Sequence, residues 1–445
     1  MHNRKLLGVW EACFRFGLTR PSFVNLLVVL SGWTLTHGPH AVTSALVATG
    51  VAGRLDWSAF HRFFSRGTWS PDQLGRNVLA QFLADDADAV GIVIDDTLAP
   101  KKGPRVFGIG SHLDAVRSTK RRLVFQFGHC WVVLAVLVRV PFSARVWALP
   151  VLFRLYRNRK ECAAKGAAYK RKTDLARELL DVFATWTRAA RIEVAADSAY
   201  CVDTVTRGLS ERFVLFGSMR PDAVLTDPPK AIAERGPGRP SKRGKPLPKP
   251  DHLARDASSP WQEAKARLYG REVTVRFKTM LGQWYRATGD RLLRIVVVEC
   301  QTGLVPYRVF FSFDSTLTPV AILEAYAGRW AIEVFFREGK QLLGFADSQA
   351  RTQGAVERVA PLVGLLYSSL VVWFADGVHQ TTLALPPLRP WYPHKRGLCF
   401  ADILRAAQRA LATQDILDPV NHSNDLRELR HFKGKRREKP DRRVA

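Results

Sequence analysis

The first part of the chain carries apolar residues at the spacing of three and four positions that amphipathic helices need. Three stretches have this spacing: Leu6–Phe16, Phe23–Leu35 and Trp57–Phe64. Ser70 followed by Pro71 is a good start for another helix, because serine can cap the first turn and proline fits its backbone angles. We therefore expect an N-terminal helical domain over residues 1–88, ending in an acidic patch at 85–88.

The pattern then changes to short runs of β-branched and aromatic residues, which are typical of strands. The runs are Gly91–Ile94, Leu123–Phe127, Trp131–Val140, Arg145–Tyr156, Arg191–Ala196 and Glu211–Ser218. An amphipathic stretch, Thr173–Arg188, lies among them and predicts a helix. Strand runs on both sides of a helix indicate an α/β domain with a mixed sheet. The first part of this domain covers residues 89–220.

Residues 221–313 interrupt that domain. The segment Arg235–Lys249 has four prolines, three glycines, six basic residues and no acid. It cannot bury apolar surface, so we expect an extended, charged loop. Strand-like runs follow at Glu272–Lys278, Gln283–Arg286, Leu292–Cys300 and Tyr307–Phe313. The sequence therefore predicts a β-rich insertion after the basic loop.

Helical spacing returns after the insertion. Thr318 and Pro319 form a cap-plus-proline start, and one helix is expected to run to about Leu343 despite Gly328. A second helix is expected over about Val356–Phe374, which completes the α/β domain at 314–378. Residues 379–445 should form a helical segment and a tail, and the last 19 positions hold nine basic and three acidic residues.

The net charge narrows the classes of partner. Lys and Arg number 67 against 40 Asp and Glu, which gives a formal charge of +27 and calls for a polyanion such as nucleic acid or an anionic membrane surface. The longest apolar stretches, Ser22–Leu35 and Ala360–Phe374, fall short of the ~18–20 residues that span a bilayer. Six scattered cysteines without C-x-x-C spacing argue against a disulfide scaffold or zinc ribbon and for a reducing compartment.

Two of the predicted strands end on acidic residues, Asp95 and Asp197. Ligands and catalytic groups gather at strand ends in open α/β sheets. Taken singly, either aspartate could instead cap a turn or the next helix. The residue types alone leave both interpretations open.

One face of the predicted helix at 319–343 also carries candidate chemistry. At about 100° per residue, four side chains fall within roughly 60° of one another. They are Tyr326, Arg329, Glu333 and Lys340. A carboxylate among cations suits phosphodiester chemistry, but a solvated face with ion pairs such as Glu333–Arg337 explains the same spacing.

These residues resemble the signature of bacterial insertion-sequence transposases of the DDE superfamily. The Tyr-x2-Arg-x3-Glu-x6-Lys spacing at 326–340 matches, Asp95–Thr97 resembles the first acidic motif, and Asp197–Tyr200 resembles the second. Lys101–Gly103, Gly128–Trp131 and the Gly-Arg-Pro-Ser-Lys-Arg-Gly stretch before the insertion are also similar. The resemblance covers about residues 55–378.

The resemblance implies a ribonuclease H-like catalytic domain with a β-rich insertion, flanked by an N-terminal helical DNA-binding domain and a C-terminal basic tail. Asp95, Asp197 and Glu333 would be the catalytic carboxylates and metal ligands. Such an all-oxygen set selects Mg²⁺ or Mn²⁺, and two ions can share an aspartate. Tyr326, Arg329 and Lys340 would bind phosphates near the transposon end.

The implied function is metal-dependent cleavage and strand transfer of mobile-element ends. Partners would be the terminal inverted repeats, target DNA and a second subunit on DNA, with no membrane, in the cytoplasm of a bacterium. Two alternatives stay open: an inactive or domesticated DNA-binding relative, and a ribonuclease H-like nuclease without strand transfer. Asp96 is an alternative first ligand, although strand alternation turns it away from Asp95 and the Asp-x-Thr match favours Asp95.

Other residues have a functional and a structural interpretation. His112 and His129 could be ligands or bases, but buried structural histidines are commoner. Trp284 and Trp330 could stack on a flipped base, but core packing is commoner. Arg154–Lys172 holds eight basic residues and one acid, which favours a DNA-contacting surface over a merely solvated face.

Overall fold

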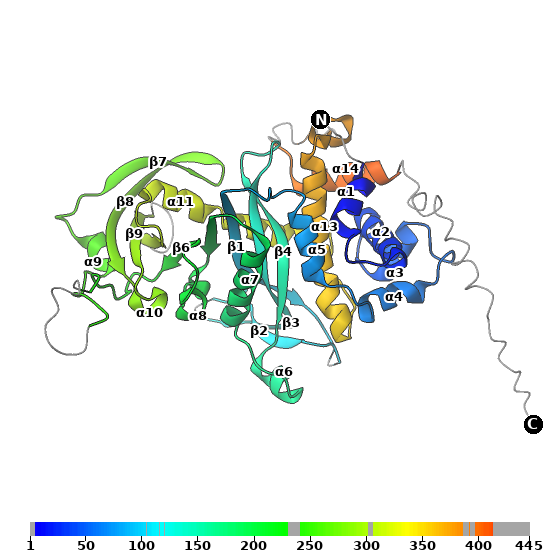
Figure 1. Ribbon diagram of the computed structural model, residues 1–445, viewed down its shortest axis with the longest axis horizontal. Helices are drawn as coiled ribbons and strands as arrows, with labels where there is room; N and C mark the ends of the chain where they lie inside the picture. Colours follow the sequence, from blue (N-terminus) through cyan, green and yellow to red (C-terminus); the bar gives the residue numbers. More distant parts are fainter. Residues whose placement is uncertain are drawn as a thin grey trace, which may run out of the picture.

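The computed structural model describes residues 5–103, 105–114, 116–119, 121–229, 241–300, 306–385, 391 and 397–412. A ten-stranded sheet runs along this part of the chain. Its strands are β1 (Ala89–Pro100), β2 (Gly110–Leu113), β3 (Phe125–Arg139), β4 (Val146–Tyr156), β5 (Arg191–Ala196), β6 (Phe213–Met219), β7 (Gln262–Leu268), β8 (Arg271–Gln283), β9 (Leu292–Glu299) and β10 (Tyr307–Ser312). The sheet separates helices on its two faces (Figure 1).

The helices cover the sheet and one end of it (Figure 1). They are α1 (Leu6–Phe14), α2 (Arg20–Leu35), α3 (Val42–Ala48), α4 (Trp57–Ser65), α5 (Pro71–Leu79), α6 (Arg159–Ala164), α7 (Lys172–Trp186), α8 (Asp203–Thr206), α9 (Pro250–Arg255), α10 (Tyr285–Thr288), α11 (Pro319–Ala327), α12 (Trp330–Leu342), α13 (Gln353–Ala375) and α14 (Phe400–Ala412). A single 3₁₀ turn, η1 (Ser198–Tyr200), follows β5. The predicted cap-plus-proline starts are confirmed, since the side chains of Ser70 and Thr318 cap α5 and α11.

The sheet is mixed. Its order is β2-β3-β1-β5-β6-β10-β9-β8-β7, and β4 pairs with β3. β1, β5 and β6 are parallel neighbours, whereas β3 runs antiparallel to β1. The prediction of an α/β domain with a mixed sheet is therefore confirmed.

The strands expected as an insertion at 221–313 are not a separate sheet. β10 pairs with β6 through residues 309–312, so β7 to β10 extend the central sheet. Two details of that prediction were wrong. Gln283–Arg286 is the end of β8 followed by α10, and β7 was missed because the polar sequence QEAKARL of an edge strand carries little apolar signal.

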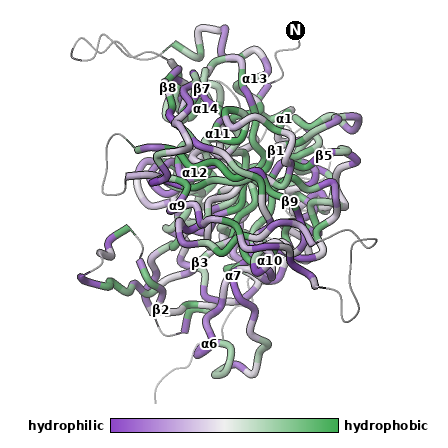
Figure 2. The backbone as a smooth tube through the Cα atoms, turned by 90° about the vertical axis from the view of Figure 1, so that its left-hand side faces the viewer, coloured by the Kyte–Doolittle hydropathy of each residue, from purple (hydrophilic) through white to green (hydrophobic). Residues whose placement is uncertain are grey.

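The N-terminal helices share a core with the rest of the molecule. Buried residues of α1, α2, α4 and α5 form one apolar cluster with α12, α13, α14 and one face of β1, β3 and β4. α7 and α8 cover the opposite face in a second cluster, and α11 packs on β6 to β9 in a third. Figure 2 shows hydrophobic positions concentrated toward the centre and hydrophilic ones in outer loops. Residues 5–88 thus share their core with the rest of the molecule instead of forming a core of their own.

α13 is the one helix in the described part of the chain that is long and apolar enough to span a membrane, but 89% of its most apolar window is buried inside the protein. Its composition is explained by this central position among α1, α4, α5 and β4. Residues 235–240 of the basic loop and the whole basic tail, residues 427–445, lie outside the described residues. Within the described remainder of that loop, Leu247 packs against the second core cluster.

The single helix expected over 319–343 is wrong. α11 ends at Ala327 and α12 begins at Trp330. The backbone between them stays right-handed but tightens, because Gly328, Arg329, Ala331 and Ile332 each donate to the carbonyl three residues back. A side-chain β-carbon on Gly328 would lie 3.3 Å from Leu137 of β3, so glycine lets this junction approach the sheet.

Candidate active site

Asp95 lies within β1 rather than at its end, which corrects the expectation that the strand stops there. The strand continues because β3 pairs with it as far as Pro100. The parallel pairing with β5, however, stops at Ile94 opposite Ala196. Asp95 and Asp197 therefore occupy the next positions on two adjacent parallel strands.

Asp197 begins the turn after β5. Its side chain caps η1 by accepting a hydrogen bond of 2.5 Å from the Ser198 N–H. Its charge acts on Asp95 and on Tyr326, since it raises the pKa of both groups. The pairing of β1 with β5 places this second acid next to the strand that carries the first.

Arg329 joins Asp95 to Glu333. Its Nη1 donates to Asp95 Oδ2 at 2.7 Å, and its Nη2 donates to Glu333 Oε1 at 2.5 Å. The exposed fractions of these side chains are 16% for Arg329, 17% for Asp95 and 35% for Glu333. The junction between α11 and α12 thus brings the third acid to the strand that carries the first.

Burial sets the electrostatics of this cluster. It raises the pKa of Asp95 to about 7, against the opposing effects of Arg329 and of the Asp96 N–H. The pKa of Arg329 is raised, because the nearby carboxylates outweigh the cost of burying its charge. The guanidinium therefore stays charged and compensates acids that water reaches poorly.

The remaining two residues of the predicted helix face lie apart from each other. The Tyr326 hydroxyl donates to Ser218 Oγ at 3.4 Å, and Arg329 lies over the Tyr326 ring at 5.9 Å. Lys340 is half-buried farther along α12. Burial lowers the pKa of Lys340, and the charge of Asp114 partly opposes this effect. Arg337 contacts Glu338 at 3.9 Å, so the alternative Glu333–Arg337 pair is replaced by Arg329–Glu333.

Asp96 points to the other face of the sheet, as alternation along a strand requires. Its Oδ2 accepts from Lys172 Nζ at 2.6 Å, and its Oδ1 accepts from the Tyr200 hydroxyl at 2.7 Å. The Cys130 thiol lies 3.4 Å from the same carboxylate. Sequence reasoning missed this network, since nothing in the spacing of these residues along the chain links them.

The sequence pattern of the DDE superfamily endonucleases matches residues 13–281, more than half of the 445-residue chain. The chain belongs to the DDE superfamily endonucleases. A search among curated proteins found no matching relative. The match includes Asp95 and Asp197 but ends before α11, so it does not reach Glu333 or the other residues of the Tyr-Arg-Glu-Lys spacing. Membership in this family supports nuclease or transposase activity on DNA, and members of the family generally use divalent metal ions.

The oxygen donors of this endonuclease fit such a metal by their chemistry. Asp95, Asp197 and Glu333 offer carboxylates only, which are the donors that Mg²⁺ and Mn²⁺ prefer. Among the described residues, however, no three acidic, histidine or cysteine side chains form a ready-made metal cluster. In this structure two N–H groups of Arg329 bind oxygens of Asp95 and Glu333.

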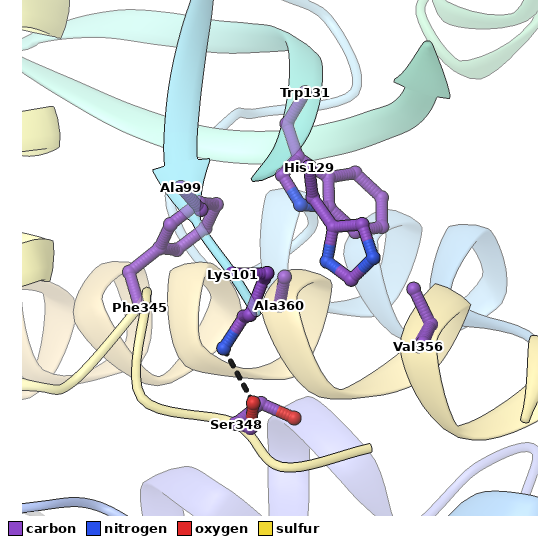
Figure 3. A pocket seen from close by; sticks show the side chains of 8 residues that line it. All are labelled: Ala99, Lys101, His129, Trp131, Phe345, Ser348, Val356 and Ala360. Carbon is purple, nitrogen blue, oxygen red and sulfur yellow. Dashed lines mark hydrogen bonds between the residues drawn. The ribbon is translucent and has the colours of Figure 1, made fainter. Parts of the chain in front are cut away.

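A small pocket of the endonuclease lies beyond the carboxylates on the same sheet face. Figure 3 shows Lys101, His129 and Trp131 among its lining residues, with Lys101 hydrogen-bonded to the Ser348 carbonyl. Lys101 Nζ also donates to the Ala346 carbonyl at 2.5 Å. Lys101 therefore fastens the loop after α12 to the end of β1, a positioning role that the Lys101–Gly103 motif did not reveal.

His112 and His129, the two histidines considered in the sequence, are both buried. His129 Nε2 lies 2.9 Å from the Phe107 carbonyl, and burial lowers the pKa of His129 to about 4. His112 is buried, and burial lowers its pKa as well. The contact with the Phe107 carbonyl therefore favours the structural interpretation for His129.

The two tryptophans differ. Trp284 packs edge-on against Phe311 in the second core cluster. Trp330 is 50% exposed beside the carboxylates and packs edge-on against Tyr269, which is 65% exposed at the β7–β8 turn. Core packing thus explains Trp284 but not Trp330.

The basic segment at 154–172 is largely paired within the protein. Five of its eight cations contact carboxylates: Arg154, Arg157, Lys170, Arg171 and Lys172. Arg159 lies over the Tyr169 ring at 4.8 Å. Much of the charge that suggested a DNA surface here therefore stabilises contacts within the fold.

Proposed function

We propose that this DDE superfamily endonuclease is a transposase that cuts DNA at the ends of its own mobile element and joins those ends to target DNA. The observation that carries the proposal is that Arg329 joins Asp95 to Glu333, while Asp197 follows the strand β5 that pairs with β1 directly before Asp95. The strand order β4-β3-β1-β5-β6 also supports it. A ribonuclease H-like domain carries its acids on the first strand, after the fourth strand and on a later helix. With the short strand β2 left aside, these places correspond to Asp95 on β1, Asp197 after β5 and Glu333 on α12.

The three carboxylates would hold Mg²⁺ or Mn²⁺, and we propose two ions. Such ions supply an activated water or 3′-hydroxyl nucleophile and stabilise the leaving oxygen of an in-line displacement. Tyr326, Arg329 and Lys340 would bind the phosphates on either side of the cut and hold them in line. Two element ends must be joined to one target, so we propose a dimer on DNA.

The test uses labelled DNA fragments that flank the protein's own gene on either side. With Mg²⁺ the wild-type protein should cut one fragment at a fixed position and join it to a target plasmid. Asp197→Asn and Glu333→Gln should lose both reactions by at least about a hundredfold, because each removes a charge that stabilises the transition state. Circular dichroism should show that both variants are folded.

Asp181→Asn and Glu211→Gln are matched controls, since both lie on the exposed surface away from the carboxylates. They should cut and join like the wild type. Glu333→Gln should also bind the flanking DNA at least as well as wild type without metal, because it removes a negative charge near phosphates. Cutting without joining would assign the protein to the nucleases, and binding without cutting would assign it to inactive relatives.

A further inference from the structure

We propose that Arg329 keeps Asp95 and Glu333 from binding a divalent cation until a DNA phosphate takes its guanidinium, so that DNA and cation promote each other's binding. This inference rests on the proposed function, because it assumes that these carboxylates bind metal and that the partner is DNA. It assigns Arg329 a second role besides phosphate contact.

The first step of the argument is that Arg329 occupies the oxygens a cation needs. One guanidinium donates to Asp95 Oδ2 at 2.7 Å and to Glu333 Oε1 at 2.5 Å. Charge-assisted hydrogen bonds of this kind are among the strong ones in proteins. A cation that binds both carboxylates must therefore first displace two good hydrogen bonds.

The second step is that the cluster needs a positive charge at all times. Asp95 and Glu333 share one guanidinium, Asp197 follows the strand that pairs with β1 directly before Asp95, and Asp95 is largely shielded from water. Like charges held this close destabilise one another unless a cation lies between them. Arg329 thus stabilises the metal-free protein and competes with metal for the same place.

The third step is that the Arg329 guanidinium can exchange its carboxylate partners for a phosphate. It lies at the junction of α11 and α12, between half-buried Gly328 and Trp330, whose side chain is 50% exposed. The planar guanidinium fork matches phosphate as well as carboxylate. In the exchange Arg329 passes from carboxylate to phosphate while the carboxylates pass to the cation, so every charge stays paired.

Such an exchange couples the two ligands. By linkage, DNA must raise the affinity for the cation by the same factor as the cation raises the affinity for DNA. Screening alone works in the opposite direction, because added divalent ions weaken contacts between basic groups and phosphates. A gain in DNA affinity on adding a divalent cation is therefore a specific sign of the exchange.

The first experiment measures Mn²⁺ binding without DNA, by the loss of the free-ion signal in electron paramagnetic resonance. Arg329→Gln should bind Mn²⁺ about tenfold more tightly than the wild type, a typical size for coupling between sites. Arg337→Gln is the matched control, because Arg337 lies on the same helix, is 60% exposed and contacts Glu338 instead. It should bind Mn²⁺ like the wild type.

The second experiment uses the wild-type chain, so it does not depend on a variant that folds. The affinity for a labelled flanking duplex is measured in EDTA and in Ca²⁺, a hard cation chosen to replace Mg²⁺. The affinity should rise several-fold in Ca²⁺, and this rise should shrink in Arg329→Gln. A fall in Ca²⁺ in the wild type overturns the coupling.

Asp95→Asn separates this inference from the proposed function. If Asp95→Asn and wild type bind Mn²⁺ alike, the carboxylates are not the metal site and the proposed function fails with the inference. If Asp95→Asn loses Mn²⁺ while folded Arg329→Gln gains no affinity, the metal site stands and only the role of Arg329 is overturned.

Discussion

Asp95 and Asp96 are neighbours in the sequence, yet they belong to two differently balanced groups of charges. Asp95 shares Arg329 with Glu333 and lies beside Asp197, so acids outnumber cations there. Asp96 has Lys172 as its cation and Tyr200 as a neutral donor, so its charge is matched. Both aspartates are poorly exposed, at 17% and 24%. The balance of charge, rather than burial, therefore distinguishes the two aspartates, and under the proposed function only the Asp95 group would bind a cation.

The largest expected effect separates the two aspartates by activity. Asp95→Asn should lower cleavage of flanking DNA in Mg²⁺ by at least about a hundredfold, because a metal-ligating charge is lost. Asp96→Asn should keep most of its cleavage per folded molecule but melt at a lower temperature. Labelled-DNA cleavage and thermal melting measured on the same samples check the contrast.

The wild-type protein without Mg²⁺ is the control for a metal-free site. Asp95→Asn in Mg²⁺ should cleave flanking DNA no faster than this control. Active Asp95→Asn together with folded, inactive Asp96→Asn would reverse the assignment of the two faces. Equal loss of activity in both variants would remove the distinction between them.

A second, smaller effect concerns stability on the Asp96 face. Lys172→Met leaves Asp96 without its cation and should lower the free energy of unfolding by roughly 1–3 kcal/mol. The double change with Asp96→Asn should cost less than the sum of the single changes, because the two side chains interact directly. Urea denaturation of the four proteins gives this cycle.

Lys160→Met is a suitable control, since Lys160 is exposed on α6 and its change should fall within about 0.5 kcal/mol of wild type. Additive losses in the cycle would show that Lys172 and Asp96 do not stabilise each other, which would contradict the prediction of a structural ion pair.

The smallest effect is expected for Tyr200→Phe. The change removes one hydroxyl donor to Asp96 and should lower the free energy of unfolding by about 1 kcal/mol. Tyr200 ends the turn that Asp197 begins, so the variant also asks whether the Asp96 face positions the second acid. Mn²⁺ affinity unchanged from wild type would show that the two faces are independent. A lower affinity in a fully folded variant would show that they are linked.

Much of the fold could be predicted because its signals are local. Thr318 and Pro319 predict the start of α11, and β-branched runs predict β1 and β5. Both signals are local, because helix capping and strand alternation act within a few residues. These features need no knowledge of distant contacts. Asp95 and Asp197 were picked out singly as acids that follow apolar runs, and only the family resemblance brought them together.

The rest depends on contacts between distant residues. The junction at Gly328 and Arg329 could not be predicted from helix spacing, and its close approach to Leu137 of β3 is a contact between distant parts of the chain. The ion pair of Arg329 with Asp95 spans 234 positions, and that of Lys172 with Asp96 spans 76. The sequence therefore indicated which residues carry charge, and only the fold shows which charges meet.

The core that α1 shares with α13 has a consequence for synthesis of the chain. Trp10 Nε1 donates to Ser369 Oγ at 3.1 Å, across 359 positions of sequence. At about 5–20 residues per second, a ribosome needs roughly 20–70 s to make that intervening length. During this time the surfaces of α1 and α2 that pack on α13 and α14 lack these partners, and a chain that ends before them never acquires them. Synthesis as far as α13 and α14 is thus a condition for fully burying the first helices.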